Sequence, residues 1–245
     1  MPDRIVAVIP IRSSDPEFRE GGRPLLAGRP LVEYTVRAAT EAQRIDRVII
    51  STDSEAIAAS CRGYGAEAPF LRPASLCGPA TTVTEVLRHA VEWLEQHEGY
   101  QADWVVKLEI THPFRPQGLI DQIVETALGT GVDSAFVAYE ERHSYWTLDA
   151  DGRPQTVGEE IDVPRSVRRP FYRDVSGLVA ITRTANLKAG RLYGDNVGLI
   201  PTRDLFALVD THEKMTGGSY RDGVGFRLAE LLAPAFEESA AWTPR

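Results

Sequence analysis

Arginine and serine side chains follow the first apolar run of the sequence. Residues 5–9 are apolar, and Pro10, Arg12, Ser13 and Ser14 come directly after them. Cationic and hydroxyl donors at the end of a strand are suited to binding phosphate oxygens. The loop lacks the glycine spacing of a P-loop or a dinucleotide fingerprint, and its acidic residues over 15–20 would repel a phosphate. These residues leave three options open: a working nucleotide loop, an altered one, or an ordinary surface connection.

Three further stretches place hydroxyl or arginine side chains after apolar runs or in turns. They are residues 51–53 (Ser-Thr-Asp), residues 76–85 and residues 111–115 (Thr-His-Pro-Phe-Arg). In an open parallel sheet, the carboxyl ends of the strands border a crevice where ligands bind. We therefore expect these stretches to converge with the loop after residue 9 on a site for a nucleotide or a sugar phosphate.

The elements that position these side chains alternate between strand and helix patterns, which is typical of βαβ units. Thr82 and Glu85 have the spacing of a capping box before the clearest apolar stripe, and Thr52 and Glu55 have the same spacing. Pro30 is expected in the first turn of a helix. We predict one α/β domain over residues 1–245 with a twisted, mostly parallel sheet. Strands are predicted at residues 5–9 (stopped by Pro10), 48–50, 104–110, 134–138, 178–182 and 207–209, with a helix at 117–128.

Residues 140–173 interrupt this alternation. The segment is polar, contains three prolines and carries Arg165, Arg168 and Arg169. A stretch of this length within a compact fold is usually functional or forms an interface. A solvated basic patch is the alternative interpretation of its arginines.

The composition argues against several classes of protein. The net charge is −8, from 27 basic and 35 acidic residues, which argues against binding to a nucleic-acid backbone. Two cysteines and five scattered histidines show no metal-ligand spacing. Neither a signal peptide nor an apolar run long enough to span a membrane is visible. We expect a soluble, cytoplasmic protein.

Five motifs carry a family resemblance. The longest is "STDSEAIAASCRGYGAEAPFLRPASL", and the others are "RPLLAGRPLVEYTV", "LEITHPFR", "RRPFYRDVSGLVAI" and "ALVDT". Together they resemble, in order and over residues 4–215, the CMP-sialic acid synthetase family, the cytidylyltransferases that activate acidic sugars. Agreement at several levels supports the comparison.

The resemblance implies a Rossmann-like nucleotidyltransferase domain and a homodimer paired through an arm at residues 139–172. It also implies CMP transfer, in which an acceptor oxygen attacks the α-phosphorus of CTP in line and pyrophosphate leaves. Such chemistry depends mainly on positioning and on neutralising phosphate charge, for which Mg²⁺ is the usual ion. The implied partners are CTP and a small acidic acceptor.

The resemblance also implies roles for single residues. Arg12, Asp210 and Glu109 form the expected catalytic set, and Asp210 is the expected Mg²⁺ ligand. The expected nucleotide-binding residues are Pro10, Arg12, Ser13, Ser14, Arg19, Arg23, Arg72, Ala80, Thr82 and Thr111. The expected acceptor-binding residues are Glu109, His112, Arg115, Arg165, Arg169 and Tyr172.

Several of these residues have a structural alternative. Arg12 could be a surface arginine after a strand, and Asp210 could be a turn or cap residue after a strand. Thr82 suits a helix N-cap as well as a hydroxyl near the nucleotide. Arg115 could equally form a structural ion pair, and His112 could be an exposed loop histidine.

The opening loop departs from the family pattern. Pro16 and Gly21 stand at two lysine positions, and Gly22 replaces the asparagine that the family uses on the nucleotide. Arg19 or Arg23 is expected to restore a cation from another backbone position. If Arg19 does so, Arg19→Ala weakens CTP binding.

The acceptor and metal positions differ as well. Leu208 stands at the first position of the family's Asp-x-Asp pair, and Glu109 replaces a glutamine that contacts the acceptor. Glu109 could supply the missing second carboxylate, in which case Glu109→Gln weakens the dependence on Mg²⁺. The acceptor is therefore left open between a sialic-type sugar, another nonulosonic acid, a Kdo-like sugar and a small phosphonate. A non-catalytic nucleotide-binding relative is the alternative of a different class.

Overall fold

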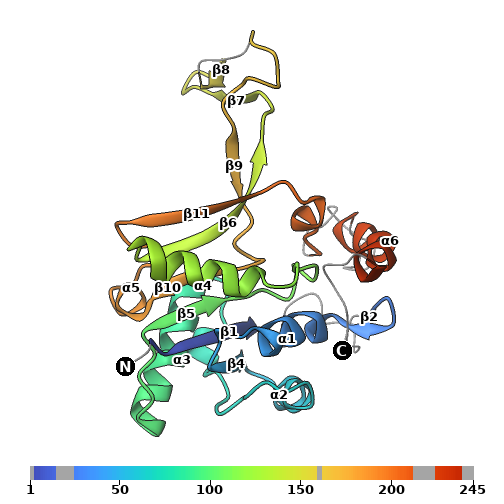
Figure 1. The fold of residues 1–245 in the computed structure, drawn as a ribbon. Helices are drawn as coiled ribbons and strands as arrows, with labels where there is room; N and C mark the ends of the chain where they lie inside the picture. The colour runs from blue at the N-terminus through green and yellow to red at the C-terminus, as the bar shows by residue number, and fades with distance from the viewer. Residues whose placement is uncertain (1–2, 15–24, 159–161, 212–223, 239–245) are drawn as a thin grey trace.

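Seven strands form one sheet through the middle of the molecule (Figure 1). They are β1 (Ile5–Ile11), β4 (Arg47–Thr52), β5 (Trp104–Lys107), β6 (Ser134–Glu141), β9 (Phe171–Asp174), β10 (Ala180–Arg183) and β11 (Val197–Thr202). The order is β11–β6–β10–β5–β1–β4, with β9 paired to β6. β4 and β5 run parallel to β1, and β11 runs parallel to β6, whereas β10 is antiparallel to β5 and β6. This computed structural model describes residues 3–14, 25–158, 162–211 and 224–238.

Alternate residues of β1 serve opposite faces of the sheet, as the pleat of a strand requires. Ile5, Ala7 and Ile9 belong to the cluster under α1 (Leu31–Glu41) and α4 (Leu119–Thr130). The intervening valines pack with α3 (Val83–Glu98) and α5 (Thr184–Lys188) on the other face. Helices therefore cover both faces of the sheet.

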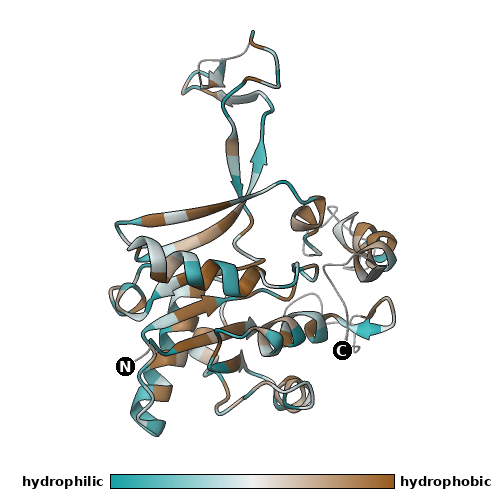
Figure 2. Cartoon of the chain, in the orientation of Figure 1, coloured by the Kyte–Doolittle hydropathy of each residue, from teal (hydrophilic) through white to brown (hydrophobic). Residues whose placement is uncertain are grey.

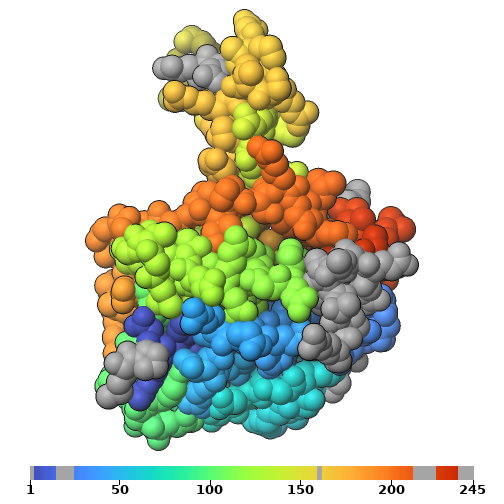
Figure 3. Space-filling view, in the orientation of Figure 1, coloured from blue at the N-terminus to red at the C-terminus, as the bar shows by residue number. Residues whose placement is uncertain are grey.

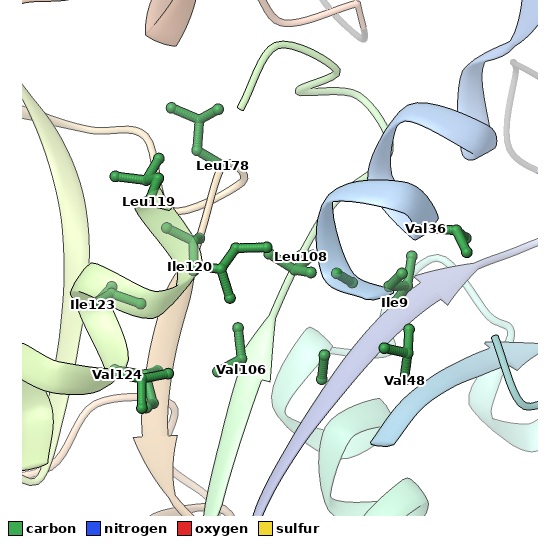
Figure 4. Packing of buried hydrophobic residues seen from close by; sticks show 14 of the residues in the cluster. Ile9, Val36, Val48, Val106, Leu108, Leu119, Ile120, Ile123, Val124 and Leu178 are labelled. Atoms are coloured by element: carbon green, nitrogen blue, oxygen red, sulfur yellow. The ribbon is translucent and has the colours of Figure 1, made fainter. Parts of the chain in front are cut away.

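The packing under α4 shows how its apolar stripe is used. Ile120, Ile123 and Val124 point from α4 toward Val106 and Leu108 (Figure 4). Figure 2 shows hydrophobic strands between helices whose outer sides are more hydrophilic. The mostly parallel α/β sheet predicted from the sequence is confirmed.

A second apolar cluster lies beside the sheet. The helix α6 (Val224–Glu238) packs Phe226 and Phe236 against Phe114 and against Leu26 of β2 (Leu25–Leu26), which pairs with β3 (Arg29–Pro30).

Two local helix-start predictions differ in outcome. The capping box at α3 is confirmed, because Thr82 accepts from the Glu85 amide and Glu85 accepts from the Thr82 amide. The capping box predicted from Thr52 and Glu55 is wrong, because Ser54 is the N-cap of α2 (Glu55–Arg62). Pro30 lies just before α1, at its N-cap, and not inside its first turn.

Several strand boundaries also differ from the sequence prediction. β1 continues through Pro10 to Ile11, and β5 ends at Lys107. The strand predicted at 207–209 is wrong, because η2 (Leu205–Leu208) is a 3-10 helix whose start is capped by the Asp204 carboxylate. β11 was not predicted.

An arm projects from the body of the protein (Figures 1 and 3). The end of β6 pairs with β9 at its base, and the hairpin of β7 (Tyr145–Leu148) and β8 (Pro154–Val157) lies farther out. Trp146 and Leu148 on this hairpin are 59% and 66% exposed. Among the described residues, no helix is both long enough and apolar enough to span a bilayer.

Candidate active site

A cavity of about 310 Å³ lies beyond the carboxyl ends of β1 and β5. The chain passes from β1 to β4 on one side of β1 and returns to β5 on the other side, which makes this edge a topological switch point. Pro10, Arg12, Arg72 and Thr81 line the cavity. Glu109, Thr111 and Asp210 also line it. The structure thus brings together six residues that the sequence prediction assigned to binding or catalysis, and adds Thr81.

The start of the loop after β1 is held by hydrogen bonds. Asp53 accepts from the Ser13 amide at 2.7 Å and from the Ser13 hydroxyl at 2.8 Å. Burial alone would raise the pKa of Asp53, but these hydrogen bonds outweigh it and lower the pKa below its ordinary value. Arg12 donates to the Gly78 carbonyl at 3.4 Å. The loop and the turn at residues 76–81 are therefore connected, and Arg19 and Arg23 lie outside the described residues.

Arg72 joins the two strands that end at the cavity. Its side chain is 4% exposed and donates to the carbonyl oxygens of Ile11 and Ser51, while its amide donates to the Thr52 carbonyl. The residue therefore stabilises the edge of the sheet and also borders the cavity.

The turn before α3 separates two neighbouring hydroxyls. Thr82 is exposed and bonded to Glu85, whereas Thr81 lines the cavity. Ala80 is exposed beside them. Thr81 was not predicted as a site residue, because the capping-box spacing indicated its neighbour Thr82.

Glu109 is joined to a buried lysine. The Lys107 ammonium lies 2.6 Å from a Glu109 carboxylate oxygen and 3.4 Å from the Ser176 hydroxyl. Burial raises the pKa of Glu109, but the charge and hydrogen bond of Lys107 outweigh this effect, and the net shift is downward. Lys107 was not among the predicted residues, although a charge within the run WVVK was a visible signal.

Asp210 is held beside the end of β5. Thr211 donates from its amide to the Thr111 carbonyl at 2.8 Å and from its hydroxyl at 3.1 Å. The neighbouring Asp210 lines the same cavity as Glu109. Two carboxylates from distant parts of the sequence therefore border one cavity.

His112 is buried at 8% exposure, so its interpretation as an exposed loop histidine is wrong. A Cβ at Gly177 would collide with the imidazole ring, which packs directly on that backbone. Burial lowers the pKa of His112. The negative charges of Asp210 and Glu109 raise it, but burial is the larger effect. The ring also lies 3.2 Å from the Thr111 hydroxyl.

Arg115 is enclosed by backbone. It is 2% exposed and donates to the carbonyls of Leu178, Gly177 and Glu109 and to the Thr35 hydroxyl at 2.8 Å. Its donors are directed into the protein. These hydrogen bonds connect the segment after β5 to α1 and to the turn before β10.

The remaining predicted acceptor residues lie on the arm. Arg165, Arg169 and Tyr172 are exposed there, and Arg165 contacts His143. None of the three lines the cavity within the same chain.

The sequence profile of a family described as cytidylyltransferase matches residues 23–174, more than half of the chain. The chain belongs to the cytidylyltransferase family. CTP-dependent nucleotidyl transfer is the chemistry of this family.

Named relatives agree with this assignment. The chain is 31% identical over 160 residues to the CMP-N,N'-diacetyllegionaminic acid synthase of Legionella pneumophila, covering 64% of this chain and 68% of that protein. It is 32% identical over 125 residues to the N-acylneuraminate cytidylyltransferase of Escherichia coli, covering 51% of this chain and 28% of that protein. The pseudaminic acid cytidylyltransferase of Campylobacter jejuni is 29% identical over 136 residues, with 55% and 58% covered.

Solved structures share the fold. A CMP:2-keto-3-deoxy-manno-octonic acid synthetase complexed with CTP aligns with a TM-score of 0.57 at 14% identity, covering 82% of this chain and 90% of that chain. The 4-diphosphocytidyl-2C-methyl-D-erythritol synthase of Anaerococcus prevotii aligns with a TM-score of 0.63 at 14% identity, covering 95% and 99%. The predicted Rossmann-like nucleotidyltransferase fold is confirmed.

Two carboxylates of the cavity wall could serve a hard cation, although one of them, Glu109, is paired with Lys107. Mg²⁺ prefers oxygen ligands and is commonly held by one or two carboxylates together with substrate phosphates. Asp210 and Glu109 are carboxylates on the cavity wall. Within the described part of the chain, no three His, Cys, Asp or Glu side chains are grouped to hold a metal, so phosphates would have to complete the ligand shell.

Proposed function

We propose that this cytidylyltransferase transfers CMP from CTP to a small acidic sugar and releases pyrophosphate. The observation that carries the proposal is the cavity at the switch point, which Arg12, Arg72, Glu109 and Asp210 all line. Acidic sugars are the acceptors named for the relatives above. A phosphonate is the rival acceptor. Measuring pyrophosphate release from CTP with acidic sugars and with a phosphonate distinguishes the two.

Each residue of the site has a separate proposed role. Arg12 and Ser14 bind the triphosphate, and Thr81 contacts the nucleotide, whereas both donors of Ser13 are already bonded to Asp53. Asp210 would hold Mg²⁺, which when bound neutralises charge on the phosphates. Arg115 holds the end of β5 and does not touch the acceptor, because its donors are directed to backbone carbonyls.

The arm supports a homodimer. Its hairpin exposes Trp146 and Leu148, two large apolar side chains that a second copy would cover. Arg165, Arg169 and Tyr172 on the arm would then reach the acceptor bound to the other subunit. We place the enzyme in the cytoplasm, where CTP is available.

Nucleotide binding tests the proposal. A ligand that binds the native state raises the melting temperature, and the stabilisation is about 2.7 kcal/mol at a hundredfold excess over Kd. CTP with Mg²⁺ should raise the melting temperature well above the effect of UTP, GTP or ATP. Equal responses to the four nucleotides, or none, would contradict the proposal.

Two variants locate the binding site. Arg12→Ala should weaken CTP binding about tenfold or more, because a hydrogen bond to a charged group contributes about 1.5–3 kcal/mol. Arg191→Ala is the matched control, since Arg191 pairs with Asp195 on the surface and does not line the cavity. Equal CTP affinities in the two variants would move the triphosphate away from Arg12.

A further inference from the structure

Lys107 and Glu109 form an ion pair on one face of the chain at the end of β5. Residues two apart in an extended segment point the same way, while Val106 and Leu108 between and beside them pack in the core with α4. The Lys107 side chain is 5% exposed and the Glu109 side chain is 37% exposed. The pair thus runs from the interior to the wall of the cavity, with the carboxylate at the cavity end.

The lysine fixes the charge and direction of the carboxylate. A buried ammonium is costly unless a partner and hydrogen bonds compensate for lost water, and Lys107 donates to Glu109 and to Ser176. The Glu109 amide also donates to the Gly177 carbonyl at 3.0 Å. Glu109 is therefore anchored through both its backbone and its side chain, and it remains a carboxylate at neutral pH.

The groups behind the pair are hydroxyls and another carboxylate. Asp174 accepts from the Ser176 amide at 2.6 Å and lies 3.5 Å from the Tyr193 hydroxyl. Burial raises the pKa of Tyr193 to about 12, so the phenol keeps its proton at neutral pH. A ligand that reaches Glu109 consequently meets a carboxylate that is already paired with Lys107.

We propose that the Lys107–Glu109 pair determines which acceptor this enzyme accepts. The ionised Glu109 selects an acceptor that places a hydrogen-bond donor, a hydroxyl or an ammonium group, against it. It disfavours acceptors that would place a carboxylate there, because two like charges in a partly desolvated site repel each other. The acidic group of the acceptor must then lie away from Glu109. Lys107 acts through Glu109 and is a positioning residue. This inference rests on the proposed function and names the acceptor chemistry of the same site.

The test compares enzyme variants with substrate analogues. Pyrophosphate release from CTP and Mg²⁺ is first measured with N-acetylneuraminic acid, 3-deoxy-manno-octulosonate and 2-aminoethylphosphonate. For the best of these acceptors, analogues are made in which each hydroxyl or amine is replaced by hydrogen. The wild type is compared with the charge-neutral double variant Lys107→Met/Glu109→Gln, and kcat/KM is obtained for every combination.

One donor of the acceptor should be coupled to the pair. Removing it should lower kcat/KM of the wild type about ten- to hundredfold, as expected for a lost hydrogen bond to a charged group. The same removal should cost the double variant about threefold or less. Lys107→Met alone should show partial loss of this selectivity, and Glu109→Asp should retain more of it than Glu109→Gln.

Other outcomes overturn the inference. If all analogues lose activity equally in the wild type and the double variant, the pair does not select the acceptor. If Glu109→Gln changes the Mg²⁺ concentration needed for half-maximal rate and leaves the acceptor profile unchanged, Glu109 is a metal ligand instead. If the double variant does not fold, Glu109→Gln alone is compared with the wild type on the same analogues. Absence of pyrophosphate with every acceptor in the wild type is a different result, which refutes the proposed function and the inference with it.

Discussion

At the scale of single residues, charged side chains around the cavity are hydrogen-bonded to the protein itself. Arg72 donates to the ends of β1 and β4, Asp53 accepts from Ser13, and Lys107 is paired with Glu109. Nucleotidyl transfer requires little covalent chemistry from a protein, so rate depends on groups that are already oriented when the substrates arrive. These contacts supply that orientation.

Arg115 provides a residue-scale prediction about stability. Replacing it with lysine leaves several buried carbonyl oxygens without donors, and each unsatisfied group costs about 1–3 kcal/mol. Arg115→Lys should therefore lower the free energy of unfolding by at least about 2 kcal/mol in urea denaturation. Arg165→Ala, on the exposed arm, should leave the free energy of unfolding within about 0.5 kcal/mol of the wild type. A stable Arg115→Lys variant with a raised KM for the acceptor would instead support the acceptor-binding role.

At the scale of elements, the start of α3 carries the hydroxyl of Thr82, which caps the helix, and that of Thr81, which we propose contacts the nucleotide. Thr82→Ala removes the N-cap and should cost about 1 kcal/mol, or about 2–4 °C in melting temperature for a chain of this size. CTP affinity should change little in this variant. Thr81→Val should do the reverse, weakening CTP binding about threefold to tenfold with little change in stability. Weaker CTP binding in Thr82→Ala alone would assign the nucleotide contact to Thr82.

The attachment of β11 to β6 should depend on pH. Asp133, just before β6, accepts from the amides of Asp195 and Asn196 at 2.8 and 3.0 Å. Burial alone would raise the pKa of Asp133, but these hydrogen bonds and the one from the Ser134 hydroxyl outweigh burial and lower the pKa. Because the pKa of Asp133 is lower in the folded protein than in the unfolded chain, its carboxylate stabilises the fold at pH values above the unfolded-state pKa of about 3.9. This stabilisation is lost as the pH falls through the folded-state pKa.

Asp133→Asn should therefore destabilise the protein by about 1–2 kcal/mol at pH 7, and the difference from the wild type should shrink below about pH 4. Urea denaturation at several pH values measures this. Asp151→Asn, on the exposed arm, is the control. A difference that stays constant down to pH 3 would mean that the charge of Asp133 is not what stabilises β11.

The elements also show what sequence patterns can and cannot predict. β1, β4 and the capped start of α3 depend on local apolar runs and spacing, and the sequence predicted them. The 3-10 helix at 205–208 was predicted as a strand, because a short apolar run does not distinguish strand from helix without its neighbours. The pairings of β9, β10 and β11 with β6 join residues far apart in the chain, which no local pattern specifies. Lys107 was missed although its charge in an apolar run, two residues before Glu109, was a visible signal; only its weaker partner, Ser176, lies far along the sequence.

At the scale of the whole molecule, the arm is expected to join two copies of the chain. Trp146→Ser with Leu148→Ser removes two exposed apolar side chains from the arm, and sedimentation velocity should then show a monomer where the wild type is a dimer. Leu231→Ser, at a site on α6 that is 78% exposed, is the matched control and should remain dimeric. A monomeric wild type at micromolar concentration would contradict the proposed assembly.

In the reaction that we propose, this enzyme makes a new bond between the α-phosphorus of CTP and an acceptor oxygen. Phosphorus-31 NMR of CTP, Mg²⁺ and the acceptor panel with the enzyme measures this directly. We predict that pyrophosphate and a CMP ester or CMP–phosphonate anhydride of the acceptor appear in equal amounts, and only when an accepted acceptor is present. We also predict that Asp210→Asn slows the appearance of both about a hundredfold or more, by analogy with loss of a charge-stabilising group. Intact CTP with every acceptor, or CMP and pyrophosphate without acceptor-linked CMP, would contradict the proposed reaction.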